Sequence, residues 1–396
     1  MITREKYIEQ IRGFYDDDLI KIITGVRRSG KSVILEQIMS EIKKKGKNII
    51  YLNFEDEKTI RTIPDSATLL AYVEQNRKPG KNYLFFDEIQ EVKDWQLACK
   101  TLRLSDNSVF ITGSNSKLLS REYTKAFSGR FISFRVRPFV YKEALEYAKE
   151  KRFDLTVADY LVWGGFPKRF ELSSISDQRR YLEDLNKSIV QNDLINRYRI
   201  DNIDLFKRIV NFVLLSNSRV VSARSIESYL KNEHIDGSIN TIIKYLGYLE
   251  EAYIIDKISP YSPRTKSELA YYFKIYDADV ALNSIHHYDN RYDLTHNLEN
   301  IVYNELIYMD YNVSVYNNED GKEIDFLAQK DGKNYYIQVA YSVAEEAAYN
   351  REFGAFANMD NSASKILITN DDIDYSTSTV KHIMLKDFLV ADSLEQ

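Results

Sequence analysis

Eight consecutive residues near the N-terminus have the types and spacing that bind a phosphate group. They fit the pattern G-x-x-x-x-G-K-[ST] and are Gly25, Val26, Arg27, Arg28, Ser29, Gly30, Lys31 and Ser32. The two glycines let the backbone turn sharply and approach the phosphates closely. In such a loop the lysine reaches the β- and γ-phosphates, and the hydroxyl group holds Mg²⁺. The pattern therefore predicts a nucleotide and Mg²⁺ here. The alternative interpretation is a Gly/Ser turn before an ordinary surface helix.

The residues on either side of this loop favour the nucleotide interpretation. Residues 19–24 (LIKIIT) are typical of a short buried strand, and residues 31–45 carry apolar side chains on one helical face. Gly46 then stands where a glycine ends a helix. A helix that begins at Lys31 directs its backbone N–H groups and the positive end of its dipole at a bound phosphate.

A second apolar run ends in two carboxylates. Residues 83–86 (YLFF) are followed by Asp87 and Glu88. A buried parallel strand places its last residue at the sheet edge where open α/β sheets bind ligands. We expect Asp87 to hold Mg²⁺ through its water shell. Glu88 is the expected general base, because a carboxylate within hydrogen-bond reach can polarise the attacking water.

Polar residues and an arginine accompany two further predicted strands. The strand 108–112 (SVFIT) precedes Gly113-Ser114-Asn115-Ser116. Either Ser114 or Asn115 could position water against the γ-phosphate, or the segment is a Ser/Asn-rich turn. Arg130 precedes the strand 131–136 and is a candidate for stabilising charge in the transition state; the alternative is an ordinary surface arginine.

These motifs resemble those of a known protein family. GVRRSGKS, FFDEIQ, ITGSNSKLL, FSGRF, GGFP (residues 164–167) and GKEIDF (residues 321–326) occur in the same order and spacing. They are similar to the bacterial and archaeal AAA+-type P-loop ATPases with a C-terminal domain of unknown function related to PD-(D/E)xK nucleases. The resemblance runs from about residue 7 to residue 372. It implies an ATP-binding ATPase and a finger role for Arg130. The absence of an N-K-x-D motif argues against guanine nucleotides.

The resemblance also implies the domain organisation. The fold class is α/β, with four parts: a P-loop ATPase core with a parallel sheet (1–139), a helical lid (140–200), a winged-helix module (201–282) and a nuclease-like domain (283–396). The second helix of the winged helix offers Lys244 against Glu250 and Glu251, which does not suit DNA. Only the presumed wing is positive, through Lys257, Arg264, Lys266 and Lys274. Contact with DNA and contact with a protein or another domain both stay open.

The nuclease-like domain lacks part of the expected metal site. Glu299 and Asp325 match two acids of the nuclease pattern, while Gln338 replaces a third acid and Ala340 replaces the lysine. Without that carboxylate the metal site is weaker, and without the lysine no positive charge lies beside the scissile phosphate. Lys333 or Lys365 could substitute from nearby strands. We therefore expect a degenerate domain that does not cleave nucleic acid but can still bind a nucleic-acid end or a protein.

Composition limits the function classes. The 396 residues include 54 basic and 59 acidic side chains, giving a net charge of −5, so no global positive field attracts nucleic acid. A single cysteine, the lack of a long apolar run and an N-terminus without a signal-peptide core predict a cytoplasmic protein with no membrane contact. Three functions remain: an Mg²⁺-dependent ATPase that couples its nucleotide state to a DNA- or protein-binding half or to a homo-oligomer, a nucleotide-gated module with negligible turnover, and an ATP-dependent nuclease.

Overall fold

The computed structural model describes residues 2–115, 118, 127, 129–261, 272–287, 291–317, 323–357, 359 and 362–395. Some residues of the motifs and of the presumed wing lie outside these ranges, namely Ser116, Lys117, Leu119, Ser128, Arg264, Lys266, Gly321 and Lys322. The chain forms two compact units, which are described separately. The first comprises residues 1–138 and 251–253, and the second comprises residues 139–250 and 254–396.

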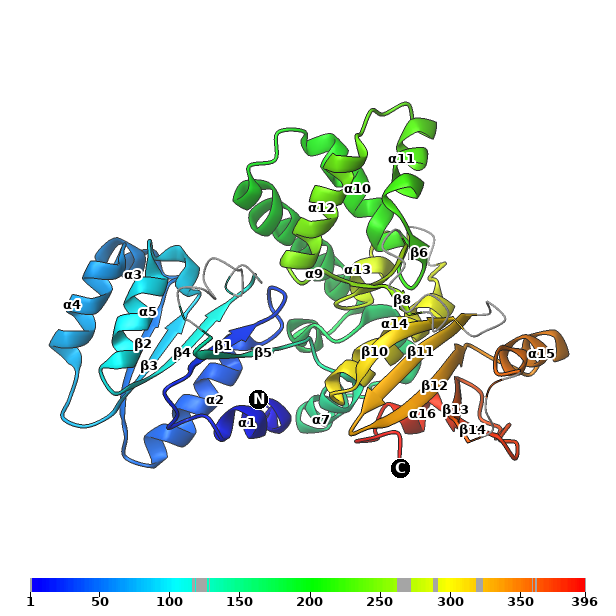
Figure 1. Ribbon diagram of the computed structural model, residues 1–396, viewed down its shortest axis with the longest axis horizontal. Helices are drawn as coiled ribbons and strands as arrows, with labels where there is room; N and C mark the ends of the chain where they lie inside the picture. The colour runs from blue at the N-terminus through cyan, green and yellow to red at the C-terminus, as the bar shows by residue number, and fades with distance from the viewer. Residues whose placement is uncertain are drawn as a thin grey trace. The chain divides into compact units, whose positions relative to one another are not determined.

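The first unit is built on a parallel sheet of five strands in the order β2-β3-β4-β1-β5 (Figure 1). Its elements are α1 (Glu5–Arg12), β1 (Ile20–Thr24), α2 (Lys31–Lys44), β2 (Asn48–Asn53), α3 (Glu57–Thr62), α4 (Ser66–Asn76), β3 (Asn82–Asp87), η1 (Ile89–Glu91), α5 (Trp95–Leu104), β4 (Asn107–Gly113) and β5 (Phe131–Arg135). Strands β1, β3 and β4 are buried along their whole length, as expected for parallel strands covered on both faces.

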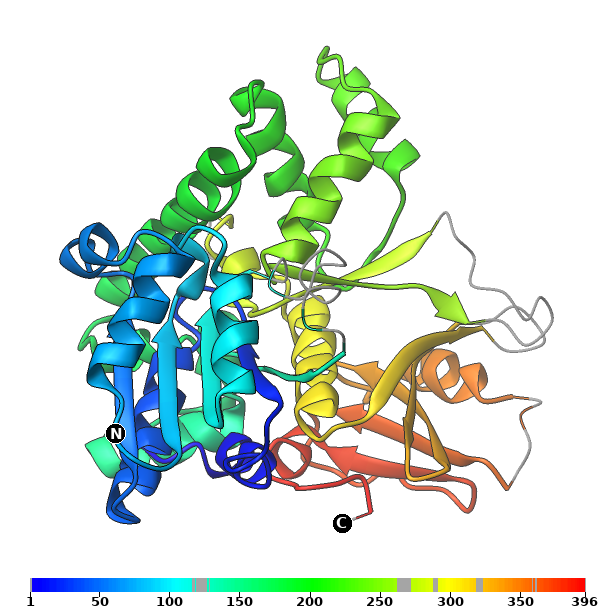
Figure 2. The ribbon, with the colours of Figure 1, turned by 60° about the vertical axis from the view of Figure 1, so that its left-hand side comes forward.

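Helices pack on this sheet, and side chains of the helices and the strands together form the core. Helix α1 contacts α2, and α4 contacts α5, so that two helix pairs flank the strands (Figure 2). The apolar runs that the sequence showed supply the core residues Ile22, Leu84, Phe86 and Ile111, and Trp95 of α5 packs with them. The predicted helix at residues 31–45 is α2, which ends one residue earlier at Lys44. This sheet and its loop between β1 and α2 confirm the predicted α/β fold class.

The second unit begins with helices. These are α7 (Tyr141–Lys151), α8 (Val157–Trp163), η3 (Pro167–Glu171), α9 (Ile175–Ser188), the π-helical segment η4 (Ile189–Asn196) and α10 (Ile203–Leu215). The GGFP motif forms the tight connection between α8 and η3. Its glycines are needed because a Cβ atom on Gly164 would lie 1.7 Å from the Asp279 carboxylate, and one on Gly165 would lie 1.8 Å from the carbonyl oxygen of Phe139.

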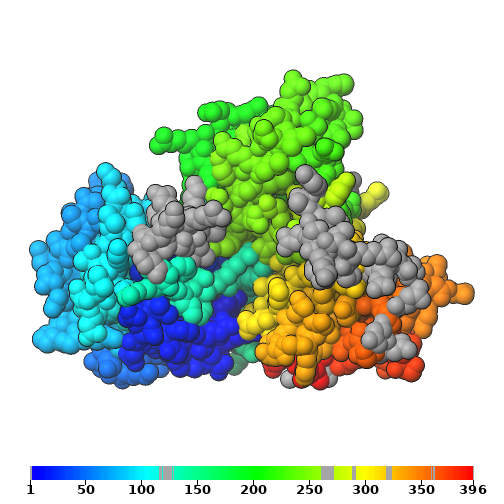
Figure 3. Space-filling model, viewed as in Figure 1, coloured from blue at the N-terminus to red at the C-terminus, as the bar shows by residue number. Residues whose placement is uncertain are grey.

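Two further helices and a small antiparallel sheet follow α10. They are β6 (Val220–Val221), α11 (Ala223–Asn232), α12 (Ile239–Glu251), β7 (Ile255–Ile258) and β9 (Phe273–Asp277), with the strand order β6-β9-β7. In the space-filling view, the helical segment that contains α10, α11 and α12 forms a continuous green surface (Figure 3). The prediction that Lys274 adds positive charge to a wing is wrong, because this side chain is buried among carboxylates, with only 4% of the residue exposed.

The C-terminal part of the second unit contains a six-stranded mixed sheet in the order β14-β13-β12-β11-β10-β8. Its elements are β8 (Pro260–Tyr261), α13 (Ala281–Ser284), α14 (Leu294–Tyr308), β10 (Asn312–Asn317), β11 (Glu323–Lys330), β12 (Lys333–Ala340), α15 (Glu346–Ala355), β13 (Ser364–Thr369), β14 (Val380–Met384) and α16 (Leu385–Phe388). Helix α14 contacts the sheet at β10, β11 and β12.

Helix α14 also binds the helices at the start of the same unit. The side-chain amide of Asn297 donates to the carbonyl oxygen of Leu161 at 3.0 Å, and the backbone N–H of Tyr141 donates to Glu305 at 2.9 Å. Buried amide and carboxyl groups require such partners because an unpaired polar group inside a protein is costly. These bonds explain why residues 139–250 and the C-terminal sheet form one compact unit.

Candidate functional site: a phosphate loop beside two carboxylates

The predicted phosphate loop connects the end of β1 to the start of α2. Gly25 has φ +144° and Gly30, which caps α2, has φ +99°; residues with a side chain rarely adopt these conformations. A Cβ atom on Gly25 would also lie 2.1 Å from the carbonyl oxygen of Val136. Arg28 has φ +65° in the same loop. The loop conformation therefore depends on glycine at both positions of the motif.

The ammonium group of Lys31 lies inside this loop. It donates to the carbonyl oxygens of Gly25 at 3.2 Å and Val26 at 3.3 Å, and it lies 3.8 Å from Oε1 of Glu88. The Ser29 side chain is fully buried, and its hydroxyl has no hydrogen-bond partner within the described part of the chain. A positive charge and an unpaired buried hydroxyl are groups that an anionic ligand can satisfy.

The other residues of the motif line the loop to different degrees. Val26 is buried, Ser32 and Arg27 are half-buried, and Arg28 is exposed. Arg27 also lies 4.0 Å from the carboxylate of Glu55. The Ser32 hydroxyl belongs to the first turn of α2, beside the N–H groups that a helix leaves unpaired at its start.

Asp87 and Glu88 come from the end of β3 and are both buried, with 2% and 9% exposed. Glu88 has φ +52°, an uncommon conformation for a residue with a side chain. The side-chain amide of Gln90 donates to its Oε2 at 2.5 Å. Strained backbone that the surrounding structure maintains is frequent at functional sites, and here it fixes the direction of a carboxylate.

Thr112 connects these two acids to strand β4. Its hydroxyl donates to Oδ1 of Asp87 and accepts the backbone N–H of Glu88 at 2.9 Å. Ser114 and Asn115 follow on the same chain segment, and both are 97% buried. Thr24 and Gly113, the last residues of two parallel strands, pair with each other. These polar residues therefore lie at the same edge of the sheet as the phosphate loop, where the strands end. The structure therefore brings together Lys31, Ser32, Asp87, Glu88, Ser114 and Asn115 at one edge.

Arg130 lies at the opposite edge of the sheet, where the parallel strands begin. It immediately precedes β5, whose first residue Phe131 pairs with Ile20 at the beginning of β1, and the N–H of Ile20 donates to the Arg130 carbonyl at 3.2 Å. The phosphate loop begins beyond Thr24, four residues along β1. At roughly 3.3 Å per residue, the two edges are about 13 Å apart. The structure does not bring Arg130 to the phosphate loop of its own chain.

Sequence reasoning missed three residues of this site. Thr112 and Gln90 hold the two acids, as described above. Arg4 is 99% buried, and its guanidinium donates to the carbonyl oxygen of Ser29 at 2.8 Å. Thr112 stands next to residues that the sequence did single out, whereas Arg4 lies in no motif and is 25 residues from its partner. Only a tertiary contact reveals its role in supporting the loop.

The three residues predicted for a nuclease-like site also lie together, in the second unit. Glu299 comes from α14, Asp325 from β11 and Gln338 from β12. The Gln338 side-chain oxygen accepts the backbone N–H of Asp325 at 3.3 Å. Lys274 bonds to both carboxylates. The suggested substitutes do not reach them: Lys333 pairs with Glu395, and Lys365 donates to the carbonyl oxygen of Met359.

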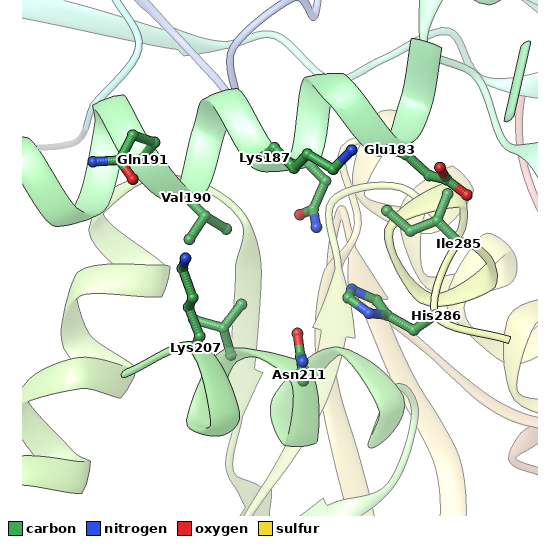
Figure 4. A pocket seen from close by; sticks show the side chains of 10 residues that line it. Glu183, Lys187, Val190, Gln191, Lys207, Asn211, Ile285 and His286 are labelled. Carbon is green, nitrogen blue, oxygen red and sulfur yellow. The ribbon is translucent and has the colours of Figure 1, made fainter. Parts of the chain in front are cut away.

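A pocket of about 610 Å³ lies elsewhere in the second unit, between α9–η4 and α10. Figure 4 shows Lys207 and Asn211 of α10 directed towards the helix that carries Lys187 and Gln191, with His286 beside them. Burial lowers the pKa of His286, which favours the neutral ring. The pocket contains none of the residues predicted to bind ATP, so it forms no part of the phosphate-loop site.

Comparison with known proteins places this geometry in a family. A family model described as an AAA domain matches residues 17–145. An uncharacterized protein of Haemophilus influenzae is 34% identical over 382 residues, which cover 93% of each chain. The chain belongs to the same family as that protein. The uncharacterized protein MJ1544 of Methanocaldococcus jannaschii is 31% identical over 374 residues, covering 89% of this chain and 82% of its own length.

The chain therefore carries an AAA-type ATPase-like domain at residues 17–145. Two further models, each described as a domain of unknown function (DUF8612 and DUF4143), match residues 154–288 and 295–388. Thus the matched domains extend through both structural units, and only the first has a description that indicates nucleotide chemistry.

Solved structures show a weaker likeness. AMPPCP-bound DnaA from Aquifex aeolicus is 16% identical with a TM-score of 0.32, covering 63% of this chain and 89% of that chain. The Hsp104:casein complex of S. cerevisiae is 16% identical with a TM-score of 0.30, covering 59% and 49%. Within the described residues, no helix combines the length and apolar character that crossing a membrane requires.

Proposed function

We propose that this chain binds ATP at the phosphate loop and hydrolyses it with Mg²⁺. The observation that carries the proposal is the 3.8 Å separation between the Lys31 ammonium group and the Glu88 carboxylate, beside a loop held by two glycines with positive φ. A cation for the transferred phosphate and a carboxylate for the attacking water are the two groups that hydrolysis requires close together.

The loop fits the phosphates of a nucleotide. The N–H groups at the start of α2, the Ser29 hydroxyl and the Lys31 ammonium group would bind their oxygens. In the described structure, Lys31 donates to two loop carbonyls, and a stronger acceptor can take over these donors because charge-assisted hydrogen bonds are stronger than neutral ones. Arg4 holds the Ser29 carbonyl from behind the loop and so stabilises the binding conformation.

The Ser32 hydroxyl and Asp87 would hold Mg²⁺, which supplies charge neutralisation for the developing phosphate oxygens. Asp87 accepts the Thr112 hydroxyl through Oδ1, which fixes the orientation of its carboxylate. Magnesium keeps several waters in most protein sites, so one serine and one carboxylate suit it. Ser32 lies in the first turn of α2 and Asp87 ends β3, so both lie beyond the carboxyl ends of the strands.

Glu88 is the proposed general base. Its uncommon backbone conformation and the bond from Gln90 direct the carboxylate, while Lys31 places a positive charge nearby. A carboxylate in this position can accept a proton from the attacking water. In the proposed step, water attacks the γ-phosphorus, its proton passes towards Glu88, and the bond to the ADP oxygen breaks.

A second copy of the chain completes the proposed site. Arg130 lies at the sheet edge opposite to its own phosphate loop, and its side chain is exposed. An arginine in this position can stabilise transition-state charge only on a neighbouring molecule. We therefore infer that the active ATPase is a homo-oligomer in which Arg130 acts between copies, an effect worth roughly 10³–10⁵ in rate where it operates.

The second unit would receive the nucleotide signal. We retain the four-part division of the chain, with its winged-helix module made of α10, α11, α12 and the β6-β9-β7 sheet. The burial of Lys274 removes one of the four positive residues expected on its wing. A weaker positive wing favours a protein partner over DNA.

The test is steady-state phosphate release by the wild type and by Glu88→Gln, with and without Mg²⁺ and with linear, nicked or single-stranded DNA. We expect Mg²⁺-dependent turnover that Glu88→Gln abolishes. Glu91→Gln changes an exposed acid of the adjacent η1 and should leave turnover unchanged. Native turnover in Glu88→Gln would refute the base assignment.

The same experiment separates the second candidate function. Because Arg130 is remote from its own loop, an isolated chain could bind ATP with negligible turnover. Tight ATP binding without phosphate release at any protein concentration would identify a nucleotide-gated module instead of an ATPase. Stimulation by one form of DNA would make DNA the partner of the second unit.

A further inference from the structure

The carboxylates of the nuclease-like cluster surround a buried lysine. Lys274 comes from β9, and its ammonium nitrogen lies 2.8 Å from Oε1 of Glu299, 2.8 Å from Oε1 of Glu323 and 3.3 Å from Oδ1 of Asp325. An ammonium group has three N–H donors and no acceptor. It therefore has enough donors for one hydrogen bond to each of the three carboxylates.

The two buried acids have further hydrogen-bond partners. The Tyr276 hydroxyl donates to Oε1 of Glu299 at 2.8 Å, and the backbone N–H of Val339 donates to Oδ2 of Asp325 at 2.9 Å. Gln338, which stands where the resemblance predicts an acid, donates to Glu352 at 2.9 Å. Each of the two buried acids is thus held by the lysine and by one further donor in a single hydrogen-bonded network.

A divalent metal ion does not fit this arrangement. Magnesium requires oxygen ligands about 2.1 Å away around a single point, and that point is occupied here by the Lys274 nitrogen. Throughout the described residues, no group of three His, Cys, Asp or Glu side chains is arranged to hold a metal ion. A metal ion would have to displace the buried, paired ammonium group of Lys274. The positive charge of the lysine would then lie beside that of the metal ion.

We propose that the Lys274 ammonium group takes the place of a divalent metal ion in this cluster, and that the resulting ion-pair centre links the β6-β9-β7 sheet to α14 and β11. The lysine lies at position 274 on β9, whereas the nuclease pattern expects it at Ala340 on β12. The cluster then has a structural role and cleaves no phosphodiester. This inference does not depend on ATP hydrolysis by the first unit.

The electrostatics keep the lysine charged, because the charges of Glu299, Asp325 and Glu323 outweigh the effect of burial and raise the pKa of Lys274 above its ordinary value. Burial and the neighbouring Asp325 charge raise the pKa of Glu299, while Lys274 acts in the opposite direction. Burial likewise raises the pKa of Asp325, again against the effect of Lys274. Removal of the lysine would therefore leave two buried acids without their cation, and a buried charge without a partner is strongly destabilising.

The test measures Mn²⁺ binding to the full-length, nucleotide-free protein by electron paramagnetic resonance. We expect the wild type and Asp325→Asn to bind Mn²⁺ identically, because Lys274 keeps metal from the cluster. In Lys274→Met we expect an additional Mn²⁺ site that disappears when Asp325→Asn is added. An Mn²⁺ site in the wild type that Asp325→Asn removes would overturn the proposal.

Thermal unfolding tests the structural role. Lys274→Met should lower the melting temperature by several degrees, and Mn²⁺ should restore part of that loss. The matched control is Lys257→Met on the adjacent strand β7, where the lysine pairs with Glu250 and its side chain is 25% exposed. A melting temperature of Lys274→Met equal to that of the wild type would overturn the structural role. If Lys274→Met does not fold, the comparison of the wild type with Asp325→Asn still decides the metal question.

Discussion

The position of Arg130 predicts that two inactive variants will restore each other's ATPase activity. Lys31→Ala removes the phosphate-loop cation, and Arg130→Ala removes the arginine at the opposite sheet edge. The edges are separated by the length of β1, about 13 Å at 3.3 Å per residue. One chain therefore cannot supply both groups to the same ATP. A site formed between an Arg130→Ala chain and a Lys31→Ala neighbour contains both.

The expected magnitude follows from random mixing. In a 1:1 mixture, half of the sites have an intact Lys31, and half of their neighbours have an intact Arg130. In a head-to-tail oligomer, about a quarter of all sites are then complete, whatever the number of subunits. Each variant alone should lose roughly 10³-fold or more in turnover. The mixture should recover about a quarter of wild-type activity.

The assay is phosphate release at a fixed total chain concentration, after the variants have been mixed and allowed to exchange subunits. Lys44→Ala, a change at an exposed lysine near the end of the same helix, serves as the control for Lys31→Ala. A mixture no more active than the two separate variants, despite wild-type assembly, would refute action between chains. Wild-type turnover by Arg130→Ala would refute any role for this arginine.

Three other changes test the site and its support. Gly25→Ala should cost about 1–3 kcal/mol through backbone strain alone and weaken ATP binding, whereas Gly13→Ala, with open space around it, should not; equilibrium unfolding and nucleotide titration measure both. Thr112→Val removes the bond to Asp87 and should lower turnover roughly 10- to 100-fold, a cost of about 1–3 kcal/mol; an unchanged rate would argue against this positioning. Burial raises the pKa of Asp279 to about 6 from an ordinary 3.8, so the folded state binds more protons in this interval, and the unfolding free energy should fall by about 2 kcal/mol as pH rises from 4 to 6. Chemical denaturation should show a weaker pH slope in Asp279→Asn, and an identical slope would contradict the buried-carboxyl explanation.

The sequence alone was sufficient for the elements of the proposed nucleotide site. The phosphate loop is a contiguous pattern between a strand and a helix, and every part of it was visible in residues 19–46. Local sequence carries this information because the loop conformation depends on glycines and on the adjoining helix start. The apolar runs before Asp87 and Gly113 likewise predicted the strands β3 and β4.

Only the tertiary structure showed which side chains meet. The contact of Arg4 with the Ser29 carbonyl and the contact of Thr112 with Asp87 join segments that lie 25 residues apart in each case. No local pattern encodes such pairs, since they depend on the order and register of the strands. The sequence placed the water-positioning group at residue 114 or 115, and the hydroxyl that bonds to the acids belongs to Thr112.

The same distinction applies to Arg130 and Lys274. Sequence indicated that Arg130 could be a finger, but the pairing of β5 with the start of β1 decided that it cannot serve its own loop. The sequence predicted that Lys274 is a positive residue of the wing, whereas folding buries it among Glu299, Glu323 and Asp325. Residue types and spacing predicted the strand, loop and helix of the proposed phosphate site, because that motif is local. Strand order and packing determined the neighbours of each charge, because these contacts form only after distant segments assemble.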